Sequence, residues 1–538
     1  MVPNWFREAV VYSLDVRTFR DSNADGRGDL QGLIEHLPYL QELGVNCIWL
    51  APFYVSNEYD DGYDVIDYFD IDPHLGTLED FGELVQSAKS VGIHIVLDLI
   101  VNHTSIHHPW FKRALENPDS IYYDYYIWSK DAKEDSGEIM FPGVEDSTWH
   151  HAPEVDAFYY HSFYRHQADL NITNPRVQAE ITRILNFWMG TGISGFRIDA
   201  VPLALRNKGG IEFEQDAFEL LNDWRSVVTG HNKDAVLLGE ADVDPQTYSK
   251  FLEHDRLTAL FNFYINNYTF FSFATQKSAP LYQAIKLLPM AQGEHYLHFL
   301  RNHDELELGI LKASERKEVF SKFAPDKNMQ IYGRGIRRRW PPMAENDLDR
   351  VKMSMSLLIS LPGTPVIRYG EEIGMGDDLN LPERRSVRTV MQWSDGDNAG
   401  FSELPPQAMH YPLIRMGEYN FKEVNVKAQK KEPKSLWNTV KGLLQLRKKW
   451  QSSFAHGQFH LVTPGHESLL AYMYTNSEGA LLVVHNLSDK KISSELAMAF
   501  DNLSDFKQIV GDAEVRVADS QVHLKLGRYG YSWIVLPL

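Results

Sequence analysis

Short apolar runs of strand type alternate along this chain with stretches that have helical spacing. About eight such runs occur, at 10–19, 47–52, 94–101, 195–201, 235–242, 259–263, 296–304 and 365–372. Stretches between them, such as DLQGLIEHLPYLQELG and TLEDFGELVQSAKSVG, end in glycine, a common helix stop. The alternation predicts an α/β fold with a parallel sheet, and about eight units predict a (β/α)8 TIM barrel. A doubly wound open sheet is the alternative, but no Gly-rich dinucleotide fingerprint favours it.

Two regions depart from this alternation. Residues 104–173 are rich in Tyr, Trp, His and Asp and lack helical periodicity, which predicts an inserted subdomain after the third strand. From about residue 451, alternating runs such as SLLAYMYT and GALLVVHNL predict a C-terminal antiparallel β-sandwich over 451–538. The catalytic barrel is therefore expected at 1–103 and 174–450.

Charge and cysteine content narrow the cellular context. The net charge of −20 argues against a nucleic-acid or anionic-membrane partner and fits a neutral small molecule. No apolar run is long enough to predict a membrane span, and no signal-peptide pattern is evident, so a cytoplasmic location is expected. Cys47 is the single cysteine and lies in an apolar run, which predicts a buried, inert thiol. A homo-oligomer stays open as one alternative.

Polar residues gather where the predicted strands end. In a barrel of this kind the carboxyl ends of all strands share one mouth, where active sites lie. The residues expected to meet there are three carboxylates, one arginine and two histidines: Asp199, Glu240, Asp304, Arg197, His103 and His303. A single carboxylate at a strand end is about as often a helix cap or a loop anchor as a catalytic group. Convergent carboxylates repel one another, so one should hold a proton, and a carboxylic acid beside a carboxylate is what glycosidic cleavage requires.

Four stretches resemble segments of the α-amylase superfamily: DLIVNH (98–103), GFRIDAV (195–201), GEAD (239–242) and FLRNHD (299–304). The resemblance implies that Asp199 is the nucleophile, that Glu240 is the general acid/base, and that Asp304 holds ring hydroxyls of the substrate. It further implies that Arg197 orients the nucleophile, and that His103 and His303 contact the sugar whose bond is cleaved.

Two further stretches extend this resemblance. DDGYD (60–64) implies an Asp–Tyr pair in the same subsite, placed at Asp60 and Tyr63, with Asp61 as the neighbouring alternative. VRTVMQW (387–393) supplies Arg388, which in pocket-type members caps the non-reducing end of the sugar. The implied mechanism is double displacement with retention, in which water as acceptor gives hydrolysis and a sugar gives transfer.

Within the superfamily, the chain is most similar to the trehalose synthases, maltose α-D-glucosyltransferases that rearrange maltose to trehalose. GIRRRWPPMAENDLDR and SLPGTPVIRYGEEIGMGD are among the matching stretches, and the likeness covers most of residues 5–402. It implies an isomerase with hydrolytic side activity on small α-glucosides. Asp242 stands where these enzymes usually carry Asn. A more open enclosure there would favour the alternative, an exo-acting α-glucosidase on maltose, trehalose or another small α-glucoside.

Two other classes fit less well. A non-catalytic, sugar-binding relative would usually have lost the catalytic carboxylates and would carry a membrane span. A sucrose-phosphorylase-like enzyme is compatible with the retained motifs, but the stretches of trehalose-synthase type disfavour it.

DSNADGRGD (21–29) carries oxygen ligands at alternate positions, as in the first half of an EF-hand loop. The expected calcium ligands are four side chains and one carbonyl: Asp21, Asn23, Asp25, Asp29 and Arg27. A plain acidic turn is the alternative. Asn102 and Asp169 resemble the second calcium site of the superfamily, between barrel and insert. Both sites would hold structural Ca²⁺, and no organic cofactor is expected.

Overall fold

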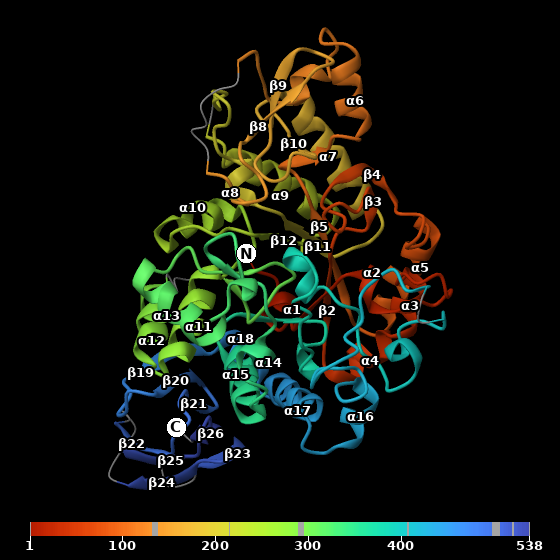
Figure 1. Cartoon of the computed structure of the whole chain (residues 1–538). Helices are drawn as coiled ribbons and strands as arrows, with labels where there is room; N and C mark the ends of the chain where they lie inside the picture. The colour runs from red at the N-terminus through yellow and green to blue at the C-terminus, as the bar shows by residue number, and fades with distance from the viewer. Residues whose placement is uncertain are drawn as a thin grey trace.

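Eight parallel strands close into a barrel at the centre of the molecule, so the predicted (β/α)8 fold is confirmed (Figure 1). The computed structural model describes residues 2–131, 138–214, 216–288, 295–405, 408–497, 506–518 and 521–536. In spatial order around the barrel the strands are β1 (Val11–Leu14), β18 (Thr364–Arg368), β14 (Tyr296–Phe299), β13 (Ala259–Phe261), β12 (Val236–Gly239), β11 (Gly195–Ile198), β5 (His94–Leu99) and β2 (Cys47–Leu50).

The barrel strands are buried on both faces, which explains why their sequences read as continuous apolar runs. Cys47 and Trp49 belong to a cluster that fills the barrel interior, so the prediction of a buried thiol is confirmed. Gly195 begins β11 at a φ of 145°, and a Cβ there would lie 1.9 Å from the carbonyl oxygen of Val236 on β12. Glycine therefore allows the close approach of these two strands.

The apolar run at 10–19 does not form one strand. Asp15 accepts a hydrogen bond from the backbone N–H of Arg17 and starts a short helix, α2 (Val16–Phe19), so the strand ends at Leu14. The longer helices outside the barrel begin at similar caps. Thr77 and Asp80 form a capping box on α5 (Leu78–Ser90), and Asn174 caps α7 (Pro175–Met189).

The insert lies at one end of the barrel, orange in Figure 1, and contains α6 (Pro109–Glu116) with short strands. One of these, β10 (Gln167–Asp169), pairs antiparallel with β6 (His103–Ser105), so that Asp169 lies opposite His103. This pairing joins the insert to the strand end of β5. The others form a small sheet: β7 (Trp128–Ser129), β9 (Ala157–Tyr160) and β8 (Trp149–Ala152).

Two antiparallel sheets at the C-terminal end, blue in Figure 1, form the predicted β-sandwich. The first contains β19 (Gln458–Val462), β20 (Leu469–Asn476), β21 (Gly479–Asn486), β26 (Tyr531–Leu536) and β23 (Lys507–Gly511). The second contains β22 (Ile492–Ala497), β25 (Gln521–Leu526) and β24 (Glu514–Ala518). The first strand of the sandwich, β19, begins later than position 451, because a short helix, α18 (Gln451–His456), lies there.

Among the described residues, none of the helices combines the length and the apolar character needed to cross a membrane.

Candidate active site

A cavity of about 450 Å³ opens where the barrel strands end, between the barrel and the insert. Seven of the residues predicted from sequence line it: Asp60, Tyr63, His103, Asp199, Glu240, His303 and Asp304. Arg197 and Arg388 lie directly behind its wall and bind residues of the wall. The structure therefore brings together the carboxylates and the other residues that the sequence predicted for one site.

Arg197 is the centre of a cluster of carboxyl groups. Its Nη1 atom lies 2.7 Å from Asp98 Oδ1 and 2.7 Å from Asp199 Oδ1, and its Nη2 atom lies 2.8 Å from Glu240 Oε2. The pairing of β11 with β5 places Arg197 opposite Asp98. Arg197 is 1% exposed, and its guanidinium stacks on the ring of Trp49. One buried cation thus holds three carboxyl groups in fixed positions.

The carboxyl groups around Arg197 are pushed toward different protonation states. Burial, with the charges of Asp199 and Asp304, raises the pKa of Glu240 to about 7. Burial also raises the pKa of Asp199, to about 6, against the opposing effect of Arg197. Near neutral pH the arrangement therefore favours a protonated Glu240 beside an ionised Asp199, as acid–nucleophile chemistry requires.

Ala200 is held in a strained backbone conformation between these two groups. Its φ of 44° is in the left-handed region, which is costly for a residue with a Cβ. In this conformation its backbone N–H donates to Glu240 Oε2 at 3.0 Å. The turn after Asp199 therefore also fixes the position of Glu240.

Asp304 has the opposite electrostatic environment. Burial alone would raise its pKa, but the guanidinium groups of Arg384 and Arg388 hold the pKa of Asp304 well below its ordinary value. The shortest contacts to its carboxylate are from Arg384 Nη1 at 2.5 Å and Arg388 Nη2 at 2.9 Å. Asp304 is therefore an ionised acceptor that suits sugar hydroxyls, and not a proton donor.

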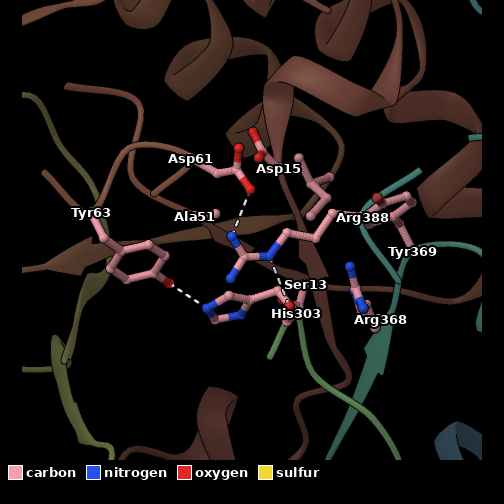
Figure 2. Close-up of a pocket in the computed structure, with 10 residues that line it drawn as sticks. Ser13, Asp15, Ala51, Asp61, Tyr63, His303, Arg368, Tyr369 and Arg388 are labelled. Atoms are coloured by element: carbon pink, nitrogen blue, oxygen red, sulfur yellow. Dashed lines mark hydrogen bonds and ion pairs between the residues drawn. The ribbon is translucent and has the colours of Figure 1, made fainter. Parts of the chain in front are cut away.

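Figure 2 shows how Arg388 is anchored in a smaller cavity that shares Tyr63 and His303 with the large one. Its Nη1 atom lies 2.6 Å from Asp61 Oδ2 and 3.4 Å from Asp60 Oδ1. Asp60 lines the large cavity, whereas Asp61 lies in a smaller cavity behind Arg388. Asp61 therefore positions the arginine, and Asp60 is the one available to substrate.

The histidines are neutral partners for a sugar. Burial lowers the pKa of His103 to about 4 and that of His303 well below its ordinary value. His303 Nε2 lies 2.7 Å from Tyr63 Oη, and the two rings stack with centroids 5.2 Å apart (Figure 2). The Tyr63 hydroxyl donates to Asp98 at 2.9 Å, which links Tyr63 and His303 to the Arg197 cluster.

Sequence reasoning missed Arg384. Its Nη2 atom lies 2.8 Å from Asp60 Oδ1, and its guanidinium covers the ring of Phe141 from the insert. Arg384 thus binds both Asp60 and Asp304, so it closes one end of the cavity. The available signal was its place in the same stretch as Arg388, four residues before it.

Three further charged residues line the cavity: Asp242, Glu307 and Arg334. Glu307 Oε1 pairs with Arg334 Nε at 2.9 Å, and Arg334 Nη2 donates to the carbonyl of Met140 in the insert at 2.9 Å. Desolvation and the charges of Glu307 and Glu240 raise the pKa of Asp242 well above its ordinary value. A protonated Asp242 can both donate and accept a hydrogen bond, as an asparagine would.

The loop at 21–29 folds around its own carboxylates. Asp21 accepts hydrogen bonds from the backbone N–H groups of Ala24 and Gly26, and Asp29 accepts from Ser22 and Gly32. Its hard oxygen donors suit Ca²⁺ in kind. No group of three or more carboxylate, histidine or cysteine side chains is placed to hold a metal within the described ranges. Calcium at this loop therefore stays a prediction.

The expectation of a second calcium site must be corrected. Lys208 Nζ lies 2.5 Å from Asn102 Oδ1 and 2.7 Å from Asp169 Oδ2. The two oxygens that a metal would need are therefore already bound to an ammonium group, so Asn102 and Asp169 as arranged do not fit a calcium ion.

Comparisons with known proteins agree on one family. A model of the α-amylase catalytic domain matches residues 14–457. Trehalose synthase/amylase of Mycobacterium tuberculosis is 37% identical, over 99% of this chain and 90% of the relative. Trehalose synthase of Pimelobacter sp. is 35% identical, over 99% of this chain and 96% of the relative. Among solved structures, isomaltulose synthase from Protaminobacter rubrum superposes with a TM-score of 0.80 and 26% identity, covering 100% of both chains.

Proposed function

Because the chain belongs to the α-amylase family, we propose that it transfers α-glucosyl units through a covalent enzyme intermediate and interconverts maltose and trehalose. Hydrolysis is the expected side reaction. The observation that carries the proposal is the Arg197 cluster, in which one guanidinium holds a carboxylate suited to attack and a carboxyl group suited to give a proton.

In the first step Asp199 attacks the anomeric carbon of the bound glucosyl unit. The bond from that carbon to the glycosidic oxygen breaks, and Glu240 donates its proton to the departing oxygen. In the second step the ionised Glu240 takes a proton from an acceptor hydroxyl, which attacks the anomeric carbon and releases Asp199. Two inversions give retention of the α configuration.

The other residues bind and orient the sugar. Asp304 and Asp60 are placed to accept from ring hydroxyls, while Arg384 and Arg388 close the end of the cavity behind those hydroxyls. A closed end limits the site to one terminal glucosyl unit, so small α-glucosides are the proposed substrates and long glucans are not.

Isomerisation also requires that the released glucose stay in the cavity and turn before the second step. We infer that Asp242 and Glu307, which line the cavity, bind its hydroxyls, and that the contact of Arg334 with Met140 joins barrel and insert beside it. Relatives named trehalose synthase support this assignment, whereas trehalose-6-phosphate hydrolase of Escherichia coli, 32% identical over 90% of this chain and 91% of the relative, represents the hydrolytic alternative. A cytoplasmic location, and a homo-oligomer as one alternative, stay predictions.

The test is product analysis by NMR after incubation with maltose and, separately, with trehalose. Conversion of each disaccharide into the other, with little free glucose, supports the proposal. Free glucose as the main product from either one supports the exo-acting α-glucosidase instead. No turnover of either disaccharide would contradict the proposal and would leave the α-glucosidase acting on another small α-glucoside.

The pH dependence of kcat/KM should be a narrow bell centred near neutrality. Activity should rise as Asp199 loses its proton, at a pKa of about 6, and fall as Glu240 loses its own, at a pKa of about 7. Initial rates on maltose over a pH series measure both limbs. An activity that keeps rising well above pH of about 7 would contradict the role given to Glu240.

Asp242→Ala should lower the ratio of trehalose to free glucose formed from maltose by about tenfold, the cost of losing one hydrogen bond to the retained sugar. Asp242→Asn should keep the ratio near that of the wild type, because an amide matches a protonated carboxyl group. The ratio is read from the same NMR spectra. Equal ratios in Asp242→Ala and the wild type would show that Asp242 does not hold the acceptor.

We also propose calcium at the loop 21–29. Removing calcium with a chelator should lower the Tm by a few degrees, and adding it back should restore the Tm, since a ligand that binds only the folded state stabilises it. Calorimetry of the wild type and of Asp25→Asn measures the effect. A shift that persists in Asp25→Asn, or no shift in the wild type, would favour a plain acidic turn.

A further inference from the structure

Lys208 lies at the junction of three segments that build the active site. It follows α8 (Val201–Ala204), the short helix after the nucleophile. Its ammonium group contacts Asn102, between the barrel strand β5 and the strand β6, and Asp169, at the end of β10 in the insert. Side-chain exposure is 3% for Lys208 and 0% for Asp169.

Within the described ranges, Lys208 is the only cation that pairs with the side-chain oxygens of Asp169 and Asn102. Asp169 Oδ1 accepts from Asn102 Nδ2 at 3.2 Å and from the backbone N–H of Ser162 at 2.8 Å. Asp169 Oδ2 accepts from the hydroxyl of Ser162 at 2.5 Å and from Lys208 at 2.7 Å. Among the described residues, Lys208 makes the one ion pair of this buried carboxylate. Without it, Asp169 would be a buried and unpaired charge, which is strongly destabilising.

Lys208 is also connected to the sugar-binding wall. The side chain of Asn102 lies against His103, with 3.2 Å between Asn102 Nδ2 and His103 Nδ1. His103 Nε2 in turn lies 3.1 Å from the carbonyl oxygen of Tyr63. A shift of Asn102 would therefore be passed to two residues that line the cavity.

We propose that Lys208 is a positioning residue that takes the place of a bound cation at this junction, so that barrel, insert and His103 are held together without metal. An amide oxygen and a carboxylate are hard donors that a divalent cation would bind, and the lysine supplies positive charge to both. Burial lowers the pKa of Lys208, and the carboxylate of Asp169 opposes that shift. The same lysine holds the pKa of Asp169 below its ordinary value, although burial would raise it.

The test is rescue of a lysine variant by calcium. Lys208→Ala should lower kcat/KM on maltose by roughly 10- to 100-fold, as loss of a partner behind a bound group typically does, and should lower the Tm by several degrees. Millimolar Ca²⁺ should then restore part of the Tm and of kcat/KM. The rescue should disappear in Lys208→Ala/Asp169→Asn. Lys286→Ala, on the exposed face of α12 (Ala279–Leu287), is the matched control.

The wild type and Lys286→Ala give the baseline response to Ca²⁺, which includes any effect of the loop at 21–29. A Ca²⁺ response of Lys208→Ala no larger than this baseline would overturn the proposal, as would a Lys208→Ala protein with wild-type Tm and kcat/KM. If Lys208→Ala does not fold, equilibrium dialysis of the wild type with radioactive calcium decides. Calcium binding that Asp169→Asn removes would overturn the proposal, and no such binding would support it.

Only the activity readout rests on the proposed function. The Tm and calcium-binding readouts remain decisive if maltose and trehalose prove not to be substrates, so the two proposals can fail separately.

Discussion

Replacing Asp199 with asparagine is expected to lower kcat on maltose by roughly 10⁴-fold or more while the protein stays fully folded. The amide cannot attack the anomeric carbon, so the step that forms the glucosyl-enzyme is lost. Its side chain has nearly the same shape as the carboxylate, so the packing around Arg197 should persist. Steady-state kinetics and calorimetry of the same preparation measure both effects.

The direction in which Asp199→Asn changes the stability can be predicted. Burial raises the pKa of Asp199 to about 6 in the folded protein. Folding therefore disfavours the ionised form, a cost that grows as the pH rises through the unfolded pKa and is fully present above about 6. Removing this charge should leave the Tm at neutral pH unchanged or slightly higher. Asp223→Asn, at an exposed position of α9 (Glu219–His231), is the control. A large loss of Tm, or kcat within about tenfold of wild type, would contradict the assignment of Asp199.

Glu240→Ala is expected to lower kcat on maltose by about 10³-fold, within the usual range for loss of a general acid. With α-glucosyl fluoride as substrate, the rate of the first step, which forms the glucosyl-enzyme, should fall much less, because fluoride departs without needing a proton. Azide should then accelerate turnover, since it attacks the glucosyl-enzyme without a general base and fits the space left by the missing side chain.

The configuration of the azide product gives the sharper result. Azide that attacks an intermediate on Asp199 must form α-glucosyl azide, because the intermediate itself is inverted relative to the substrate. NMR of the product distinguishes the two anomers. The β anomer, or no acceleration by azide, would contradict the role of Glu240 as acid/base behind a covalent intermediate.

Much of the fold and the centre of the site follow from local sequence signals. Continuous apolar runs identify the barrel strands, and polar residues placed just after them are brought together because parallel strands end at one mouth. The register of β11 against β5 then sets Arg197 opposite Asp98. The apolar run at 10–19 was less informative, because Asp15 caps a short helix in its second half and the strand ends at Leu14.

Contacts between distant segments could not be predicted in the same way. Lys208 and Asn102 are separated by 106 positions, and Arg384 and Asp60 by 324. A charged residue in a loop carries no local signal of the buried carboxylate that it will meet. Resemblance to the second calcium site of the superfamily suggested a metal at Asn102 and Asp169, and the structure supplies a lysine that lies outside any recognisable ligand spacing.

The central claim is that Asp199 forms a covalent bond with a glucosyl unit. The most direct measurement is to trap that species with 5-fluoro-α-glucosyl fluoride, whose second fluorine slows breakdown of the intermediate, and to locate the label by peptide mass spectrometry. The account predicts one added fluoroglucosyl group, on the peptide that contains Asp199, and none in Asp199→Asn. A label on another residue, or turnover of the reagent with no labelled protein at any time, would contradict it.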